Sequence, residues 1–348
     1  MKKLLVLVLA AALLGVLCGC AQSDPSKTIV VYNWEDYIDP EVLEDFTEET
    51  GIKVDYQRFT TNEDMWIKMT RGGTSYDVVF PSDYMIERMI AQDLLLTIDH
   101  SKLPDYDNLY DWMQNPGYDE NNTYSIPYMW GTVGVLYNID MTGEEITSWK
   151  QLWDTKYVDQ VCMMDSIRDT LGVTLKMLGY PINTREQAHL QDAKAALIEQ
   201  KQSGVLLAYG VDDIKDKLIN GECAIGLVWS GDAVYAMGYN ESLRYSVPEE
   251  GSNVWLDGMV IPKTSKNPDG AMQFIAYMMR PDIAARNSEY IGYSTPSEAA
   301  MALMDESYQT LEAFNPPQEV IDRCEWFHDL PSEDLPYYES IWTEITAN

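Results

Sequence analysis

A tryptophan and a carboxylate stand two residues apart in one short apolar stretch, Val254 to Pro262. Residues at this spacing on a β-strand share a face, so we expect Trp255 and Asp257 to present an indole ring and an anion to the same space. The face of an indole attracts a cation, and a carboxylate pairs with it. This pair therefore suits an organic cation, and the alternative is a core tryptophan beside a strand-end aspartate.

Similar side chains lie at the ends of other predicted strands. Trp34-Glu35-Asp36-Tyr37 lies at the end of the strand 28–34, and Ser82-Asp83-Tyr84 follows the strand 77–81. Ligands of parallel α/β sheets gather at the carboxyl ends of the strands, so both groups fall on the expected binding edge. For Ser82 and Asp83 the alternative is capping of the helix that follows, and for Asp83 this interpretation is equally good.

Asp169 and Trp229 extend this pattern further along the chain. Asp169 lies at the start of a predicted helix, and Trp229 ends the predicted strand 223–229. Asp169 stands three residues after Ser166, which is the spacing of a helix cap, so a purely structural role for Asp169 stays open. Trp229 is also compatible with a position in the core.

Composition excludes several classes of function. The 348 residues include 24 Lys and Arg against 56 Asp and Glu, which gives a formal charge of −32. Such a surface repels nucleic acid and attracts cations. The aromatic residues are 23 Tyr and 10 Trp but only 6 Phe, and Tyr and Trp are favoured where a ligand is held. The chain has three scattered histidines and no HExxH, GxSxG or P-loop motif, so nothing predicts a metal, a cofactor or a hydrolase triad.

The elements that would position these residues alternate between strand and helix. Apolar periodicity, caps and turn residues predict further strands at 52–59, 124–138, 161–164 and 205–209, and helices at 62–71, 147–157, 183–202, 212–220, 267–279 and 281–289. This rhythm predicts βαβ units and a parallel sheet in an α/β fold.

The N-terminus has the pattern of an exported protein. A short basic start precedes an apolar run, 4–17, that is too short for a typical membrane span, and Leu17-Cys18-Gly19-Cys20 follows it. This pattern resembles a bacterial lipoprotein signal, which predicts a signal peptide at 1–19, lipid attachment at Cys20 and a tether at 20–27. Acyl chains would anchor the protein to the outer face of the cell membrane, on the periplasmic side or at the cell surface. Ordinary secretion with cleavage nearby is the alternative.

Several separated motifs together resemble the spermidine/putrescine-binding proteins of bacterial polyamine ABC importers. Each motif is weak alone, but their shared order and spacing make the set specific. They are Tyr32-Asn33-Trp34-Glu35-Asp36-Tyr37, Pro81-Ser82-Asp83-Tyr84, Ser125-Ile126-Pro127-Tyr128, Trp255-Leu256-Asp257 and Ile291-Gly292-Tyr293.

The resemblance implies a type II periplasmic-binding-protein fold, in which two α/β lobes enclose a ligand cleft and crossover strands form the hinge. The implied lobes are 28–134 with 257–303, and 135–256 with 304–348. The chain must cross between them, and we predict crossings near Gly134 and Trp255.

In that family, aromatic rings flank the methylene chain of a linear polyamine, and carboxylates pair with its ammonium groups. Carried over position by position, the implied ligand-binding residues are Trp34, Asp36, Tyr37, Ser82, Tyr84, Asp169, Trp229, Trp255, Asp257 and Tyr293. The implied protein is a monomeric receptor, not an enzyme, that delivers spermidine or putrescine to the permease subunits of an ABC transporter. The alternatives are a sugar-binding receptor of the same fold and a glycoside hydrolase with two carboxylates.

Three positions depart from the family pattern. Ser166 stands where the family's spermidine binder has an aspartate, Phe327 stands where it has a glutamine, and Asp36 is a shorter acid than the usual glutamate. One fewer carboxylate indicates either a less highly charged ligand, such as a diamine, or replacement of the acid by Asp165 or Asp83. The sequence does not decide between spermidine and putrescine.

Overall fold

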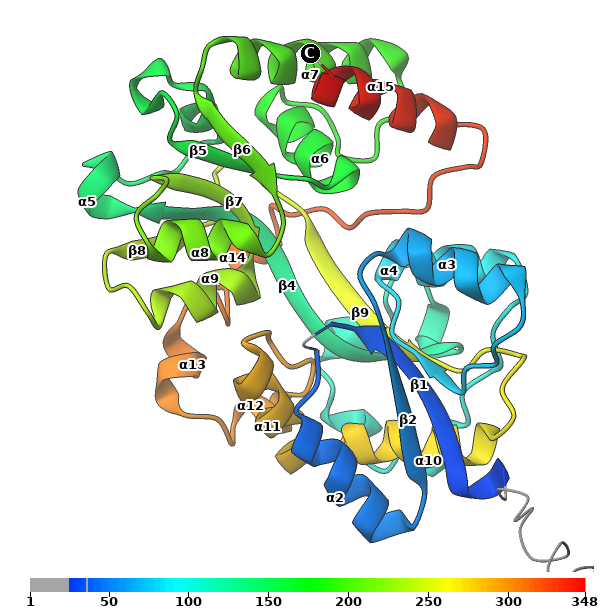
Figure 1. Ribbon diagram of the computed structural model, residues 1–348. Helices are drawn as coiled ribbons and strands as arrows, with labels where there is room; N and C mark the ends of the chain where they lie inside the picture. Colours follow the sequence, from blue (N-terminus) through cyan, green and yellow to red (C-terminus); the bar gives the residue numbers. More distant parts are fainter. Residues whose placement is uncertain (1–24, 36, 348) are drawn as a thin grey trace, which may run out of the picture.

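A mixed β-sheet runs through the protein, and one long strand joins its two halves (Figure 1). The computed structural model describes residues 25–35 and 37–347. Within these residues eight of the nine strands follow the order β2-β1-β3-β9-β4-β7-β5-β6, and the ninth, β8, lies off this path and pairs with β4. The strands are β1 (Thr28–Trp34), β2 (Lys53–Phe59), β3 (Val78–Val79), β4 (Ser125–Asn138), β5 (Val161–Met164), β6 (Leu206–Gly210), β7 (Ile225–Trp229), β8 (Leu243–Ser246) and β9 (Val254–Val260).

The prediction of a parallel sheet is wrong for the central strands. β1 runs parallel to β2 and β3, and β5 runs parallel to β6 and β7, as βαβ units require. β9 runs antiparallel to β3 and β4, and β4 also runs antiparallel to β7 and β8. A parallel neighbour needs a long crossover, usually a helix. The chain instead reaches β4 through short 3-10 turns between residues 100 and 122, so its direction was not fixed by a βαβ unit.

β4 is the link between the two halves of the sheet. It pairs with β9 as far as Thr132 and with β7 from Val133 onward, so the pairing changes beside Gly134, where we predicted a crossing. Every residue of β4 is buried. The backbone of Glu325 forms a further connection beside this link. Its N–H donates to the carbonyl of Ser252, shortly before β9, and its carbonyl accepts a bond from the N–H of Val254, the first residue of β9.

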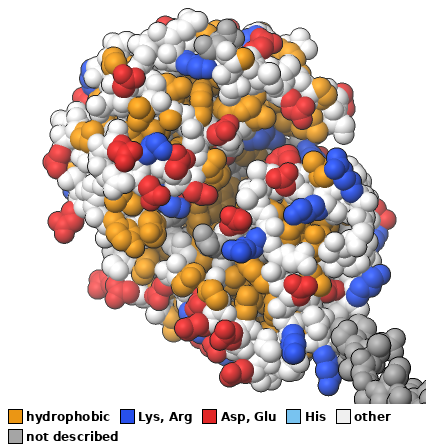
Figure 2. Space-filling model, in the orientation of Figure 1, with side chains coloured by type: hydrophobic (Ala, Val, Ile, Leu, Met, Phe, Trp, Pro, Cys, Tyr) orange, Lys and Arg blue, Asp and Glu red, His pale blue; other side chains and the backbone are white. Residues whose placement is uncertain are grey.

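Separate hydrophobic cores lie on either side of this link. One core is formed around β5, β6 and β7, and two others lie around β1, β3 and β9. Figure 2 shows that the visible face is hollowed between the two halves of the molecule and that hydrophobic side chains line the hollow. The lobe boundaries stay a prediction. A small cluster joins Ala300 to Met304 and Phe314 across the expected boundary at 303 and 304.

Helices cover the outer faces of both lobes (Figure 1). The longer ones are α2 (Pro40–Thr50), α3 (Asn62–Arg71), α4 (Asp83–Ala91), α6 (Ile167–Met177), α7 (Gln187–Gln202), α8 (Asp213–Ile219), α9 (Ser230–Met237), α10 (Pro268–Met278), α11 (Pro281–Ile291) and α15 (Leu335–Ala347). The shorter ones are α5 (Ile139–Thr142), α12 (Glu298–Met301), α13 (Glu306–Thr310) and α14 (Gln318–Ile321). In the part of the chain that the structure describes, no helix has the length and apolar character needed to cross a membrane.

Two of the predicted helices differ from the observed elements. The segment 147–157 forms two 3-10 turns, Trp149–Trp153 and Thr155–Tyr157, because the extended backbone of Asp154 ends the first turn and caps the second. α7 begins four residues after Asn183, whose side chain bonds instead to the backbone of the C-terminal segment 326–328.

Candidate ligand-binding cleft

Asp257 on β9 is a buried anion with only one oxygen satisfied. Asp257 is only 6% exposed to solvent. The Tyr37 hydroxyl donates a hydrogen bond to Oδ2 at 2.8 Å, whereas Oδ1 is buried and accepts no bond from the described residues. Burial raises the pKa of Asp257 to about 6, and the nearby hydroxyls of Ser82 and Tyr37 offset part of this effect. Because buried polar atoms are nearly always paired, Oδ1 is an acceptor available to a ligand.

Trp255 and Asp257 are joined through Tyr293. The ring of Trp255 lies 5.1 Å from that of Tyr293, and the ring of Tyr293 lies 5.7 Å from that of Tyr37, the donor to Asp257. A Cβ at Gly131 would lie 2.7 Å from the indole, so only glycine lets β4 pass this closely. The three rings therefore form an aromatic wall beside the carboxylate.

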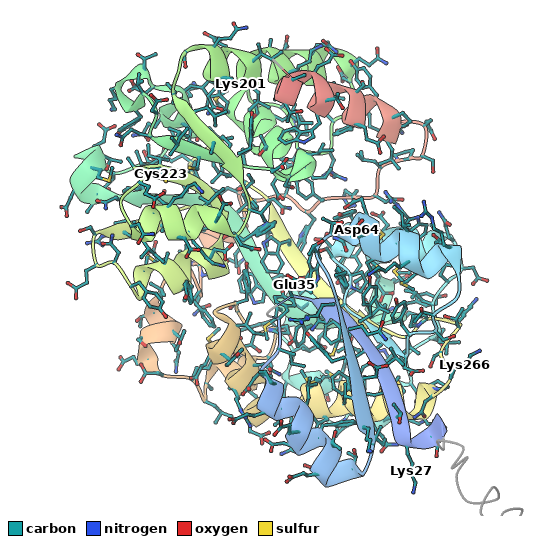
Figure 3. The ribbon with its side chains drawn as sticks, viewed as in Figure 1. Lys27, Glu35, Asp64, Lys201, Cys223 and Lys266 are labelled. Carbon is teal, nitrogen blue, oxygen red and sulfur yellow. The ribbon has the colours of Figure 1, made fainter. Side chains whose placement is uncertain are left out.

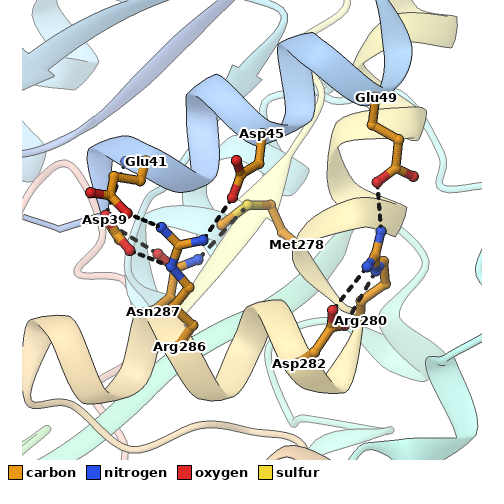
Figure 4. A network of polar contacts seen from close by, with 9 residues as sticks. All are labelled: Asp39, Glu41, Asp45, Glu49, Met278, Arg280, Asp282, Arg286 and Asn287. Carbon is orange, nitrogen blue, oxygen red and sulfur yellow. Dashed lines mark hydrogen bonds and ion pairs between the residues drawn. The ribbon is translucent and has the colours of Figure 1, made fainter.

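An ion-pair network fixes the loop that carries Tyr37 (Figure 4). Arg286 on α11 pairs with three carboxylates of this loop and of α2, which are Asp39 at 2.6 Å, Glu41 at 2.9 Å and Asp45 at 2.7 Å. Asn287 accepts a further bond at 2.9 Å from the backbone N–H of Asp39. Because α11 ends directly before Gly292 and Tyr293, one helix positions both of these tyrosines.

Asp169 is a second buried anion, at the start of α6, the helix that follows β5 in the other half of the sheet. The residue is 7% exposed, and its Oδ2 accepts a bond from the Ser166 hydroxyl at 2.6 Å. Ser166 is also the N-cap of α6, so the capping interpretation describes this pair correctly. Burial raises the pKa of Asp169 to about 6, while Ser166, the charge of Arg168 and the Trp229 indole lower it. Trp229, at the end of β7, therefore lies beside this carboxylate.

Trp34 and Ser82 border the cleft with their polar groups already engaged. The indole N–H of Trp34 donates to the backbone oxygen of Phe80 at 2.8 Å. Ser82 pairs with Asp257 through an isolated backbone bridge, and its hydroxyl accepts a bond from Asn62 at 3.0 Å. Ser82 precedes α4 without a side-chain capping bond, so its hydroxyl does not cap that helix.

Tyr84 faces the other lobe across the cleft. Its hydroxyl donates to Glu63 at 3.2 Å, and the guanidinium of Arg168 on α6 lies 5.4 Å from its ring centre. The same guanidinium lies 4.4 Å from the ring of Phe327. An arginine therefore stacks between two aromatic rings next to Asp169.

Two predicted residues, Asp36 and Cys20, lie outside the described residues. Figure 3 labels Glu35, the neighbour of Asp36, on the loop that follows β1 between the two lobes. The predicted strand end therefore opens toward the hollow seen in Figure 2.

Asp83 and Asp165 were the candidates for the acid that Ser166 lacks. Asp83 is 1% exposed and accepts bonds from the backbone N–H groups of Tyr84 at 2.7 Å and Leu256 at 3.4 Å. Burial, and then the nearby charge of Asp257, raise the pKa of Asp83 well above its usual range. Asp83 thus lies at the Asp257 end of the cleft. Asp165 is exposed on the loop beside Ser166.

Sequence reasoning missed a further carboxylate, Asp232, in the first turn of α9. The residue directly before it, Gly231, touches the Tyr293 ring so closely that a Cβ there would lie 2.4 Å from a ring carbon. Burial has the largest effect in raising the pKa of Tyr293, and the charge of Asp232 has the second largest. The sequence signal that could have identified Asp232 is its position three residues after Trp229, which ends β7.

The structure thus has two α/β lobes, linked by β4 and β9, with buried carboxylates and aromatic rings between them. These features define a two-lobed receptor for a small solute. The family of bacterial extracellular solute-binding proteins matches residues 41–316, and the chain belongs to this family.

Known proteins agree with this assignment. The chain is 35% identical to the spermidine/putrescine-binding periplasmic protein of Salmonella typhimurium, over 100% of this chain and 99% of that protein. A solved structure assigned to a spermidine/putrescine ABC transporter from Listeria monocytogenes is 39% identical, with a TM-score of 0.87, and covers 92% of this chain and 99% of its own. The spermidine/putrescine ABC transporter substrate-binding protein of Streptococcus pneumoniae is 40% identical, with a TM-score of 0.83 and the same shares covered.

These comparisons confirm the predicted fold, two α/β lobes of the periplasmic-binding-protein type, and the predicted family resemblance. Membership in an extracellular family makes the chain an exported protein. The relatives are transport proteins and not enzymes.

Proposed function

We propose that this chain is a receptor that binds a linear polyamine, spermidine or putrescine, and delivers it to an ABC importer. The carrying observation is the pair of buried carboxylates, Asp257 and Asp169, which come from different halves of the sheet and lie beside aromatic rings. A polyamine is an apolar chain with a positive charge at each end. Separated anions with aromatic walls complement such a ligand, and cation–π contact adds to the ion pairs.

The orphaned oxygen of Asp257 favours a cationic ligand over a neutral one. A buried anion without a counter-ion is costly, and a ligand ammonium would supply both the charge and the missing hydrogen bond. Tyr37, Trp255 and Tyr293 would hold the methylene chain beside that end. Asp36, Ser82, Tyr84, Trp34 and Trp229 complete the proposed site.

Ligand capture would use closure of the two lobes about β4 and β9. The described chain crosses between the lobes at these strands and again near Glu325, which gives a hinge of few connections. Closure would exclude water from the ion pairs and present a closed receptor to the permease subunits. In this proposal the receptor is a monomer that catalyses no reaction and needs no cofactor or metal.

Export and anchoring complete the proposal. The signal peptide 1–19 would be removed, Cys20 would carry the acyl chains, and 20–27 would tether the receptor to the membrane. Two or three acyl chains suffice for stable anchoring. Metabolic labelling of the full chain with a fatty-acid probe tests this step, because Cys20→Ser should abolish the label.

Titration calorimetry with putrescine, spermidine and maltose tests the ligand class. We expect heat and saturation with at least one amine and none with maltose. Binding of the sugar without binding of an amine would replace this proposal by the sugar receptor. Turnover of a chromogenic glycoside that is lost in Asp257→Asn would replace it by the glycoside hydrolase.

A further inference from the structure

A lysine of the protein itself is paired with a carboxylate next to the candidate cleft. The ammonium of Lys215 on α8 lies 2.8 Å from Oδ1 of Asp232 on α9, and their side chains are only 24% and 13% exposed. The same ammonium lies 5.6 Å from the ring centre of Tyr235. One cation is therefore held by a carboxylate and an aromatic ring.

The first turn of α9 places this ion pair against the site. Gly231 packs on the ring of Tyr293, and the hydroxyl of Ser230 accepts a bond at 3.3 Å from the backbone of Thr132 on β4. Asp232 follows directly on this turn. Its carboxylate is thus a further half-buried acid in this region, in addition to the buried carboxylates of Asp257, Asp169 and Asp83.

Lys215 has the chemistry of the proposed ligand. A lysine side chain is a four-carbon methylene chain that ends in an ammonium, which is the same group as one end of putrescine. The carboxylate of Asp232 raises the pKa of Lys215 despite the opposing effect of burial, so the ammonium stays charged. The other acids near Lys215, Asp212 and Asp216, are exposed, and solvent and salt screen their charges.

We propose that Lys215 is a specificity-determining residue, because its ammonium occupies Asp232 and denies that carboxylate to a third ammonium of a bound triamine. This inference rests on the proposed polyamine site. With Lys215 in place, the cleft presents the carboxylates of Asp257 and Asp169 to the two ends of a diamine. A longer triamine would have to compete with a covalently tethered cation, which is present at high effective concentration.

The test compares spermidine and putrescine affinities by titration calorimetry of wild-type protein and Lys215→Met, which keeps the length of the side chain but removes its charge. We expect the ratio of the spermidine affinity to the putrescine affinity to rise at least tenfold in Lys215→Met. The gain should disappear when Asp232→Asn is added. If thermal unfolding shows that Lys215→Met is not folded, Lys215→Gln serves in its place.

Lys217→Met is the matched control. Lys217 lies on the same helix with a side chain that is 26% exposed, and it pairs with Asp213, which is not a residue of the proposed site. This variant removes the same charge and should leave the affinity ratio unchanged. An unchanged ratio in Lys215→Met, an equal rise in Lys217→Met, or a rise that survives Asp232→Asn would overturn the inference. Failure of the wild-type protein to bind either amine would instead overturn the proposed function.

Discussion

Tyr37 and Asp257 stand 220 positions apart in the sequence, yet the tyrosine hydroxyl donates a 2.8 Å hydrogen bond to the buried carboxylate. This bond joins the loop after β1 to the strand β9. It satisfies one carboxylate oxygen and leaves the other, Oδ1, buried and without a partner among the described residues. The anion is thus held in a fixed orientation with one oxygen left for a ligand.

Replacement of Asp257 by asparagine should weaken polyamine binding at least tenfold, which corresponds to about 1.4 kcal/mol. The amide keeps the shape of the side chain but removes the charge that an ammonium would pair with. Calorimetry of Asp257→Asn measures the loss. Asp269→Asn is the control for net charge, because the Asp269 side chain is 83% exposed on α10. Equal affinities in wild-type protein and Asp257→Asn would remove Asp257 from the site.

Replacement of Trp255 by leucine should also weaken polyamine binding at least tenfold. The change removes the indole that contacts the Tyr293 ring, together with its cation–π and dispersion contacts to the ligand. Trp342→Leu is the matched control, because Trp342 packs on Tyr209 in the other lobe. A similar loss in both variants would indicate a general effect on the fold and not a contact with the ligand.

Local signals in the sequence predicted many of the elements correctly. β1 and α3 have the predicted bounds, because β-branched and aromatic residues form most of the strand and Thr61 and Gly72 delimit the helix. The period of two placed Trp255 and Asp257 on one face of β9. The direction of β4 could not be predicted in this way, because strand pairing depends on the path of the whole chain.

Contacts between distant segments limited the prediction of the site. The composition and motifs indicated Asp257 as an anion for a cation, but neither its bond to Tyr37 nor the Arg286 network has a local signal. Asp232 was missed for the same reason. Its role depends on the packing of Gly231 against Tyr293, which lies in another part of the chain.

Ligand affinity should fall as the pH is lowered through 6. Burial raises the pKa values of Asp257 and Asp169 to about 6 in the ligand-free protein, and a bound ammonium would lower both. Below pH 6, protonation competes with the ligand. For a pKa of about 6, each carboxylate reduces affinity about tenfold at pH 5 if its bound pKa lies below that pH. The amines themselves stay charged over this range.

Calorimetry at pH 5 and pH 7.5 measures this effect, and Asp257→Asn should lose about half of it on a logarithmic scale. The stability of the ligand-free protein should change in the opposite sense. Because the folded pKa values exceed the unfolded value of about 3.9, stability is gained as the pH falls from 6 toward 4 and lost as it rises through 6. An affinity that does not depend on pH would contradict the assignment of both buried anions to the site.

Replacement of Arg286 by glutamine should lower both stability and ligand affinity. The change removes the cation shared by Asp39, Glu41 and Asp45 and leaves these carboxylates to repel one another. We expect a loss of about 1–2 kcal/mol in the free energy of unfolding, the range typical of a broken network. Affinity should fall because the loop that carries Tyr37 loses its anchor, and thermal unfolding with calorimetry measures both effects.

Arg280→Gln is the matched control for this prediction. Arg280 lies near the start of the same helix and pairs with Glu49 and Asp282, away from the loop of Tyr37 (Figure 4). It should lower stability modestly and leave affinity unchanged, because no contact of Arg280 with the described residues reaches the cleft. Loss of affinity in Arg286→Gln alone would show that the network acts by positioning Tyr37. Equal losses in both variants would mean that affinity follows overall stability, and the positioning role would then be wrong.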